Sequence, residues 1–364
     1  MKFKIALFIL ALAFFLLFLS SCEQDLPEKR QLVRHERKDM VLLAGGDLIC
    51  ASYVEVAIRK YGSDYPFKKI QKYIDKADIA FANLECVISD RGRVRSSDPR
   101  KINYDATPAV METISSSGFD VFSIANNHVY DMGADGVKRF RELLGETDLY
   151  FGGAGKNIKE ASMPEIIKVN GLTIAFLFYN STGFNFCAGN KRSGYNCMPF
   201  KKKKEALEIL SKDIKKIKNA DIKILTIHWG KNYNIVTSKE QREFAHAAVD
   251  MGIDIILGHS SHLFHGIEIY KDKPILYDMG DLLVSNPDYW DTRSFLYYIH
   301  ILDGKFSHLE MVPIYIPNSQ VRIAEGLLAD EIIWRKRNLS SLLGTSLTVK
   351  DGRAFIYLSE GVAE

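Results

Sequence analysis

The sequence predicts an α/β fold, and three observations support this prediction. Short apolar runs of β-prone residues alternate with segments of helical periodicity along most of the chain. Several of these runs end abruptly in polar residues, which is typical of α/β folds that build a site at the carboxyl ends of their strands. The composition, 47% hydrophobic and 26% charged over 364 residues, is that of a globular protein with a substantial core.

The first 39 residues are predicted to lie outside this fold. Two lysines precede an unbroken apolar run at residues 5–19, which is short for a transmembrane helix and suits a signal peptide. The run ends in Leu-Ser-Ser-Cys, which resembles the lipobox of bacterial lipoproteins. We therefore expect residues 1–21 to be removed and Cys22 to be lipidated, the alternative being an uncleaved signal anchor. Residues 22–39 are charged and poor in apolar side chains, as expected of a flexible tether.

The net charge of +3 includes the two lysines of the signal peptide, so the rest of the chain is close to neutral. This balance argues against a nucleic-acid-binding protein. One loop carries four arginines that could accept anions, although an ordinary exposed loop is the favoured explanation: Arg91, Arg93, Arg95 and Arg100.

Export would allow disulfides, and the sequence has two pairs of cysteines to consider. Cys187 and Cys197 flank a Gly- and Asn-rich stretch, where a disulfide would stabilise the fold by about 3 kcal/mol. The spacing does not decide between this bond and two free thiols. Cys50 and Cys86 each follow the end of a predicted strand and could pair or lie side by side as small apolar residues.

The first half of the fold predicts three strands that end in polar residues. The strands are expected at residues 40–44, 78–82 and 119–124, and the helices at residues 66–76, 107–117 and 134–144. Two glycines after the first strand allow a sharp turn that leaves Asp47 at its end. Glu85 follows the second strand, and Asn126, Asn127 and His128 follow the third.

The second half predicts a hairpin, then strands that end in histidine. Residues 165–169 and 172–179 are joined by Asn-Gly, the strongest hairpin signal in the sequence. The remaining strands are expected at residues 221–227, 254–257, 274–277, 295–301, 307–316 and 353–358, with helices at 202–219, 240–251 and 325–343. His228 follows the first of these strands, and His259 and His262 follow the second.

Side chains that can bind metal thus recur at the ends of strands. A strand-end Asp often caps a helix and a single His is usually structural, but five such groups in succession are hard to explain by packing. If the strands form one sheet, these groups converge on one edge of it. Imidazole, carboxylate and amide oxygens together suit Mn, Fe or Zn better than Ca or Mg. The sequence therefore predicts a site for one or two divalent metal ions.

The motifs that carry these groups resemble the motif series of the CapA family of capsule-synthesis proteins. They are Gly46-Asp47, Asn83-Leu84-Glu85, Ala125-Asn126-Asn127-His128 with Asp131 and Gly133, His228-Trp229-Gly230, and Gly258-His259 through His262. The resemblance spans residues 40–316 and implies a fold similar to calcineurin-like metallophosphoesterases. That fold is a layered αββα sandwich with metal-binding loops at the carboxyl ends of its strands. We expect one domain at residues 40–320, with residues 321–364 packing on it as a helix and a strand.

The resemblance also implies roles for individual residues. The implied metal ligands are Asp47, Glu85, Asn127, His228, His259 and His262. His128 would lie near the leaving group, and Asn126 is expected to make hydrogen bonds in the turn.

Three departures from the metallophosphoesterase pattern predict two unequal metal positions. Ile49 stands where that pattern has a histidine, Glu85 replaces an aspartate, and two residues rather than one separate His259 from His262. The first position would keep Glu85, Asn127, His228 and His259. The second would keep Asp47, Glu85 and His262, and would be the weaker one unless Asp281 or His265 contributes.

The function that the resemblance implies is the synthesis of capsule or another anionic surface polymer, of the poly-γ-glutamate type, outside the cytoplasm. The protein would be a membrane-anchored, metal-dependent hydrolase that acts on a phosphoester or an amide, with His128 donating a proton. The alternative is a non-catalytic accessory that binds the polymer or a synthase partner. A cytosolic nucleotide hydrolase would conflict with the lipobox.

Overall fold

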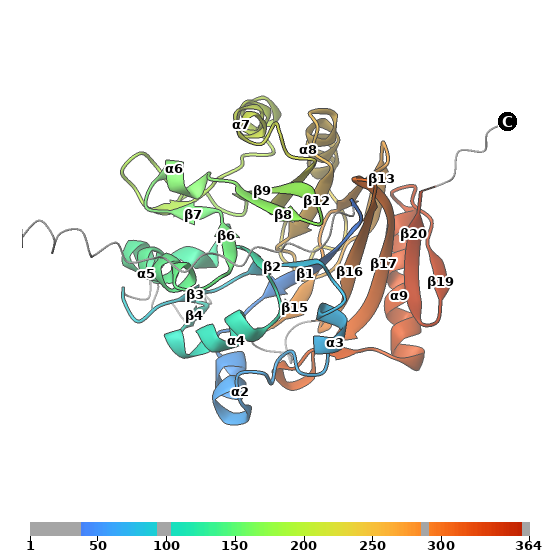
Figure 1. Cartoon of the computed structure of the whole chain (residues 1–364), viewed down its shortest axis with the longest axis horizontal. Helices are drawn as coiled ribbons and strands as arrows, with labels where there is room; N and C mark the ends of the chain where they lie inside the picture. The colour runs from blue at the N-terminus through green and yellow to red at the C-terminus, as the bar shows by residue number, and fades with distance from the viewer. Residues whose placement is uncertain (1–37, 93–102, 285–290, 359–364) are drawn as a thin grey trace, which may run out of the picture.

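The computed structural model describes residues 38–92, 103–284 and 291–358. The predicted signal peptide, Cys22, nearly all of the tether, and Arg93, Arg95 and Arg100 lie outside the described residues. Two β-sheets face each other in the middle of the molecule, with helices on their outer sides (Figure 1). No helix among the described residues is long and apolar enough to cross a membrane.

The first sheet has ten strands, and its strands change direction at β1. Its order is β19-β20-β17-β16-β1-β2-β5-β6, with β15 paired to β1 and β18 to β17. The pairs β1–β2, β2–β5, β5–β6 and β1–β15 are parallel, whereas β16, β17 and β20 run antiparallel to their neighbours. The strands are β1 (Met40–Leu48), β2 (Ile79–Leu84), β5 (Val121–Ser123), β6 (Tyr150–Gly152), β15 (Asp281–Leu283), β16 (Arg293–Leu302), β17 (Lys305–Tyr315), β18 (Arg322–Ile323), β19 (Thr348–Lys350) and β20 (Arg353–Tyr357).

The second sheet has six strands in the order β13-β14-β12-β11-β9-β8. Its central strands β9, β11, β12 and β14 are parallel. The strands are β8 (Glu165–Val169), β9 (Leu172–Asn180), β11 (Ile222–His228), β12 (Ile255–His259), β13 (Ile267–Tyr270) and β14 (Lys273–Leu276). β8 and β9 form the predicted hairpin, and both Asn170 and Gly171 have a positive φ, as the tight turn requires.

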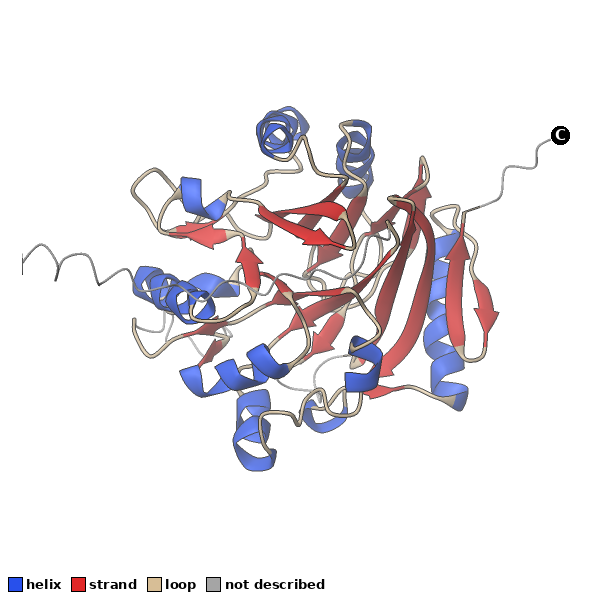
Figure 2. Ribbon diagram, viewed as in Figure 1, coloured by secondary structure: helices blue, strands red, loops and turns tan. Residues whose placement is uncertain are grey.

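Helices cover the outer face of each sheet, so the layers follow the αββα order expected from the resemblance (Figure 2). Those on the first sheet are α2 (Tyr53–Tyr61), α3 (Gln71–Ile74), α4 (Met111–Ser116) and α5 (Gly133–Gly145). Those on the second are α7 (Lys203–Lys216) and α8 (Lys239–Asp250). Apolar side chains fill the space between the sheets, where Phe81 of β2 stacks on Phe176 of β9 with ring centroids 5.9 Å apart.

The C-terminal segment packs on the same layers. α9 (Gly326–Ser341) contributes buried residues to the core between the sheets, and β20 pairs with β17. The described residues also form two small two-stranded sheets. One pairs β3 (Val87–Ile88) with β4 (Asp105–Ala106), and the other pairs β7 (Ala154–Gly155) with β10 (Gly194–Tyr195). The short helices are α6 (Ile158–Ala161), η1 (Pro108–Val110), η2 (His128–Tyr130) and η3 (Pro317–Ser319).

Two expectations about the elements need correction. The helix predicted at residues 66–76 is limited to α3, because the segment before it folds as consecutive turns that also bury Phe67 and Ile70. The strands that end in polar groups do not form one sheet but divide between two. The polar groups therefore meet across the space between the sheets.

The cysteines behave differently in the two pairs. Cys187 and Cys197 form a disulfide. Cys50 and Cys86 are buried and not disulfide-bonded.

Candidate metal centre

The first sheet supplies the carboxylates of the site through the register of three parallel strands. Asp47 on β1 is paired with Asn83 on β2 and with Asp281 on β15. Glu85 follows β2 directly. Because these residues occupy matching positions at the carboxyl ends of parallel strands, their side chains lie at the same edge of the sheet.

A bulge in β1 brings Asp47 and Asp281 together. The strand was predicted to end at residue 44, before Gly45-Gly46. Instead, β1 continues to Leu48, with a shift of register between Ala44 and Asp47. A Cβ on Gly46 would lie 1.8 Å from the carbonyl oxygen of Gly280, so only glycine fits there. This close approach lets the backbone N–H of Asp47 donate to that oxygen at 2.9 Å.

The second sheet supplies the histidines. His228 and His259 end the neighbouring strands β11 and β12 in direct register, and their Nδ1 atoms are 3.0 Å apart. His262 follows after a tight turn in which Ser260 has φ 115° and His262 has φ 62°. Hydrogen bonds from the N–H of Ser260 to Asp47 and from the N–H of Ser261 to Asp278 hold this unusual backbone. The turn explains how two intervening residues still bring both imidazoles into the site.

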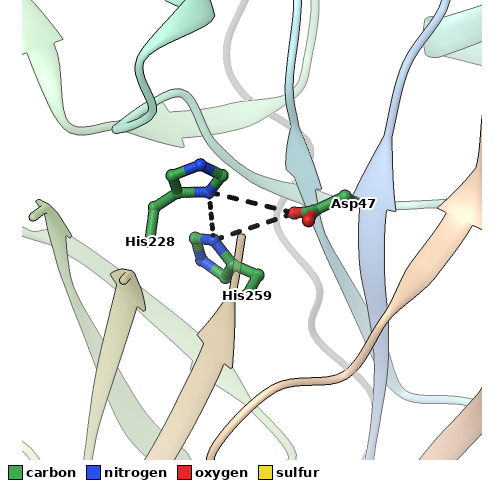
Figure 3. Close-up of side chains that lie close together, drawn as sticks. All are labelled: Asp47, His228 and His259. Carbon is green, nitrogen blue, oxygen red and sulfur yellow. Dashed lines mark hydrogen bonds and ion pairs between the residues drawn. The ribbon is translucent and has the colours of Figure 1, made fainter. Parts of the chain in front are cut away.

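Two groups of potential ligands share Asp47. In the first, the Oδ1 atom of Asp47 lies 4.0 Å from Nδ1 of His228 and 3.8 Å from Nδ1 of His259 (Figure 3). In the second, Nδ1 of His262 lies 3.7 Å from Oδ2 of Asp47 and 2.9 Å from Oδ1 of Asp281. All five side chains are buried.

Glu85 and Asn127 lie beside these groups. The Oε1 atom of Glu85 is 3.4 Å from Nε2 of His228, and its Oε2 atom is 3.9 Å from Nδ1 of His262, so Glu85 faces both groups. The side-chain oxygen of Asn127 is 2.8 Å from Nε2 of His228. It also accepts a hydrogen bond from the hydroxyl of Thr182 at 3.2 Å.

His128 lies beside the site and is more exposed, at 13%, than the other imidazoles. Its Nδ1 atom lies 2.6 Å from the carboxylate of Asp131, which also accepts the backbone N–H of Tyr104. The ring donates from Nδ1 to this carboxylate, which orients it. Its Nε2 atom lies 3.9 Å from Oε1 of Glu85, which faces both groups of potential metal ligands.

Asn126 has the turn role that was predicted for it. Its side-chain oxygen accepts the N–H groups of His128 and Val129, and its amide donates to the carbonyl of Leu84 at 2.9 Å. Asn126 therefore connects the loop after β5 to the end of β2.

Asn83 belongs to one of the sequence motifs, but no role was predicted for it. Its amide donates to Asp47 at 2.7 Å and lies 3.3 Å from Nδ1 of His228, so it positions a carboxylate and an imidazole together. Asp278 was missed as well, and its carboxylate accepts the N–H groups of Ser261 and Gly280. An amide or a carboxylate directly after a predicted strand is the sequence signal that could have identified both.

Three residues considered earlier lie outside the cluster. His265 points away, with Nε2 donating to the carbonyl of Asn234 at 2.6 Å, so of the two proposed helpers only Asp281 joins a ligand group. Arg91 pairs with Glu142 on α5 at 3.1 Å. Ile49 is fully buried in the outer core of the first sheet.

Burial and close charges perturb the acids and imidazoles of the cluster. Burial raises the pKa of Asp47 well above its usual value and lowers the pKa of His259 well below its usual value. Burial also opposes ionisation of Glu85, but the imidazoles of His262 and His228 lower its pKa to about 2. Burial raises the pKa of Asp281 to about 7, although His262 acts in the opposite direction.

A divalent cation fits this donor set. Glu85 Oε2, Asp281 Oδ2 and His259 Nε2 are buried and have no hydrogen-bond partner among the described residues. Unpaired buried polar atoms of this kind are costly, and coordination to a cation would satisfy them. Carboxylate oxygens and imidazole nitrogens are ordinary ligands of Zn, Mn and Fe.

The comparison with protein families agrees with the motifs. The family described as "Bacterial capsule synthesis protein PGA_cap" matches residues 41–286, which include every residue of the candidate metal centre. The chain belongs to this family of bacterial capsule synthesis proteins.

Curated relatives of this family member carry related names. The chain is 28% identical over 339 residues to "Capsule biosynthesis protein CapA" of Bacillus anthracis, which covers 90% of this chain and 80% of that protein. It is 29% identical over 274 residues to "PGA biosynthesis protein CapA" of Bacillus subtilis, covering 74% and 70% of the two chains. A "Probable polyglutamine synthesis accessory protein" of Mycobacterium tuberculosis is 27% identical over 261 residues, which is 68% of each chain.

Solved structures show more distant similarity. A hypothetical protein from Thermus thermophilus matches with a TM-score of 0.48 and 15% identity, covering 76% of this chain and all of that one. A 5'-nucleotidase precursor from the same organism matches with a TM-score of 0.38 and 10% identity, covering 85% of this chain and 60% of that one. Similarity at this level supports no inference about activity.

Proposed function

We propose that this family member is a membrane-anchored, metal-dependent hydrolase that acts during the synthesis of an anionic capsule polymer of the poly-γ-glutamate type. One observation carries the hydrolase proposal. Three buried carboxylates and three buried imidazoles gather between the sheets, and within the described part of the chain one oxygen each of Glu85 and Asp281 has no hydrogen-bond partner. A structural core would be expected to pair such groups.

Seven residues would hold one or two metal ions. They are Asp47, Glu85, Asn127, His228, His259, His262 and Asp281. Asp47 and Glu85 face both histidine groups, so both would be shared between the two positions, and Asp281 would complete the second. When bound, a divalent ion lowers the pKa of a coordinated water and polarises the oxygen of the substrate.

The protein's own side chains would place the reacting groups. Asp131 accepts the Nδ1–H of His128 and would stabilise the doubly protonated ring, whose Nε2–H would then pass to the departing oxygen or nitrogen. Asn126 fixes the backbone of His128 and thereby sets the position of this donor. The bond broken would be a phosphoester or a γ-amide of the polymer.

The polymer and the membrane anchor enter the proposal from other observations. Relatives in two Bacillus species are named for capsule or PGA biosynthesis, which motivates the choice of polymer. The lipobox at Cys22 motivates the anchor, whose test is labelling with a palmitate analogue. The label should disappear in Cys22→Ala.

The rival function is a non-catalytic accessory that binds the polymer or a synthase partner. Ile49, a buried apolar residue where metallophosphoesterases have a histidine, favours it, as does the word "accessory" in the name of the mycobacterial relative. The two functions differ in whether bound polymer is cleaved.

The deciding experiment measures metal-dependent cleavage by the full chain of poly-γ-glutamate and of a generic phosphodiester. As a hydrolase, wild type turns over at least one of them, and His128→Ala lowers kcat by about 10²–10⁴-fold. The matched control is His308→Ala, whose imidazole stacks on His300 on the outer part of the first sheet. Tight binding of polymer without any turnover would replace the hydrolase by the accessory.

A further inference from the structure

A pocket of about 500 Å³ borders the metal centre and belongs to none of its ligand groups. Thr182 lies in its wall and donates to Asn127, the amide that faces His228. Gly230, two residues beyond His228, lies in the wall as well. The pocket is therefore one residue removed from the metal centre. The volume is within the range of pockets that bind small molecules or short stretches of a polymer.

The beginning of α8 forms one wall of this pocket. Ser238, Glu240 and Gln241 all line it, and Ser238 is the N-cap of this 12-residue helix. The amino end of a helix favours negative charge because its N–H groups and dipole point toward the ligand. By itself this feature would not establish a site.

A second, independent observation points to an acceptor. Gln241 is only 2% exposed, and its Nε2 atom has no hydrogen-bond partner among the described residues. Its Oε1 atom accepts the N–H of Ser238 at 2.9 Å in a capping box, so the amide orientation is held. The nearest atom to a Cβ built at position 230 is this Nε2, at 3.4 Å, so Gly230 and Gln241 lie side by side in the pocket wall. A buried amide donor fixed in a pocket wall without a partner is suited to bind an acceptor on a ligand.

The rest of the wall suits a chain that carries carboxylates on methylene groups. Lys201, Lys202 and Lys231 contribute positive charge, and Glu240 is the one acid among the described residues of the wall, although Lys202 also pairs with Glu205 at 3.4 Å. Phe184, Pro199 and Phe200 contribute apolar surface. A γ-linked glutamyl chain alternates these two properties, since each residue has a free carboxylate and two methylenes.

We infer that this pocket is a subsite that binds a carboxylate of a γ-glutamyl chain through Gln241 and the amino end of α8, next to the metal centre. The inference rests on the proposed function, because it assigns the polymer of that function to a place on the protein. Gln241 and the three lysines would set how the chain lies relative to the reacting bond. They would take no part in bond cleavage.

The test measures the dissociation constant of the full chain for a defined γ-glutamyl oligomer by calorimetry. Gln241→Glu keeps the capping acceptor but replaces the donor with a negative oxygen. It should weaken binding at least about tenfold, because a hydrogen bond to a charged group is exchanged for repulsion. Glu240→Gln should tighten binding, an effect that a purely structural role would not produce.

The lysines supply a second pair of variants. Lys201→Ala with Lys231→Ala should weaken binding and reduce its salt dependence. Lys305→Ala with Lys350→Ala removes the same charge from exposed positions on β17 and β19 and should leave binding unchanged. An oligomer whose carboxylates are amidated should bind poorly to wild type. The inference is overturned if Gln241→Glu binds like wild type or if the amidated oligomer binds equally well. A phosphodiester polymer that binds more tightly and with the same dependence on Gln241 would overturn the assignment to carboxylates.

These outcomes are separable from those of the proposed hydrolase. Binding is measured without turnover, and His228→Ala should retain binding of the oligomer while losing cleavage. Absence of cleavage in wild type with weakened binding in Gln241→Glu would reject the hydrolase and keep the subsite. Normal cleavage with unchanged binding in every pocket variant would reject the subsite alone.

Discussion

The Nε2 atom of His228 lies 2.8 Å from the side-chain oxygen of Asn127, although 101 residues separate them in the chain. His228 ends β11 in the second sheet, and Asn127 follows β5 in the first, so this contact joins the two halves of the sandwich at the candidate metal centre. Glu85 reaches the same nitrogen at 3.4 Å. Contacts between the protein's own side chains thus bring together an imidazole, an amide oxygen and a carboxylate.

The first prediction concerns metal content and His228. Substituting His228→Ala should lower metal affinity more than about a hundredfold, because losing only a hydrogen-bond partner of a ligand already costs about 10–100-fold. Mass spectrometry of the purified protein after dialysis measures the metal per chain. The control is His246→Ala, since His246 pairs with Glu268 at 3.0 Å, away from the cluster. Metal content equal to wild type in His228→Ala would remove this residue from the ligand set.

The second prediction separates the two ligand groups. Asp47 belongs to both groups and Asp281 to only one. Asp47→Asn should therefore weaken both metal positions, whereas Asp281→Asn should weaken the second and leave the first occupied. Titration of metal into protein stripped by a chelator measures the two affinities. Equal losses at the two positions in Asp281→Asn, or loss at only one position in Asp47→Asn, would contradict the shared role of Asp47.

The third prediction concerns stability against acid and the buried Glu268. Burial opposes ionisation of Glu268, but hydrogen bonds from Tyr277 and Arg242 lower its pKa below the usual value. The ionised Glu268 therefore stabilises the folded state fully above pH about 4.3, the pKa of Glu in the unfolded chain. This stabilisation is lost as the pH falls through the lower pKa of Glu268 in the folded state.

Glu268→Gln should thus cost about 1–3 kcal/mol at pH 7, the range expected for hydrogen bonds to a charged group, and progressively less in acid. Urea unfolding of both proteins across this pH range measures the difference. Exposed Glu243→Gln on α8 is the matched control and should show little effect at any pH. If the difference in free energy of unfolding between Glu268→Gln and wild type does not shrink at low pH, ionisation of Glu268 does not stabilise the fold.

The fourth prediction concerns the disulfide. Cys187→Ser with Cys197→Ser should lower the free energy of unfolding by about 3 kcal/mol under oxidising conditions, because the bond closes a short loop in the unfolded chain. The same comparison under reducing conditions should give almost no difference. Cys50→Ser, a change at a buried thiol outside the disulfide, should not show this dependence on redox conditions. Equal stabilities of wild type and the double variant under oxidising conditions would count against the bond.

The residues of the candidate centre could be found in the sequence because their signal is local. An apolar strand followed closely by Asp, Glu, Asn or His is visible within a few residues, and Asp47, Glu85, Asn127, His228, His259 and His262 were all identified as candidates in this way. The hairpin at Asn170-Gly171 was predicted for the same reason, since its turn depends on two consecutive residues with positive φ.

Only the tertiary structure decided how these residues combine. Asp281 joins Asp47 because β15 pairs with β1, and His265 is excluded because its ring turns to the carbonyl of Asn234. Asn83 and Gln241 have roles that depend on neighbours far away in the chain or on a pocket wall. Strand pairing, the facing of two sheets and the absence of a hydrogen-bond partner are consequences of packing between distant segments. Periodicity and spacing describe each segment alone. They therefore located the strand ends but could not predict which strands pair or which side chains meet.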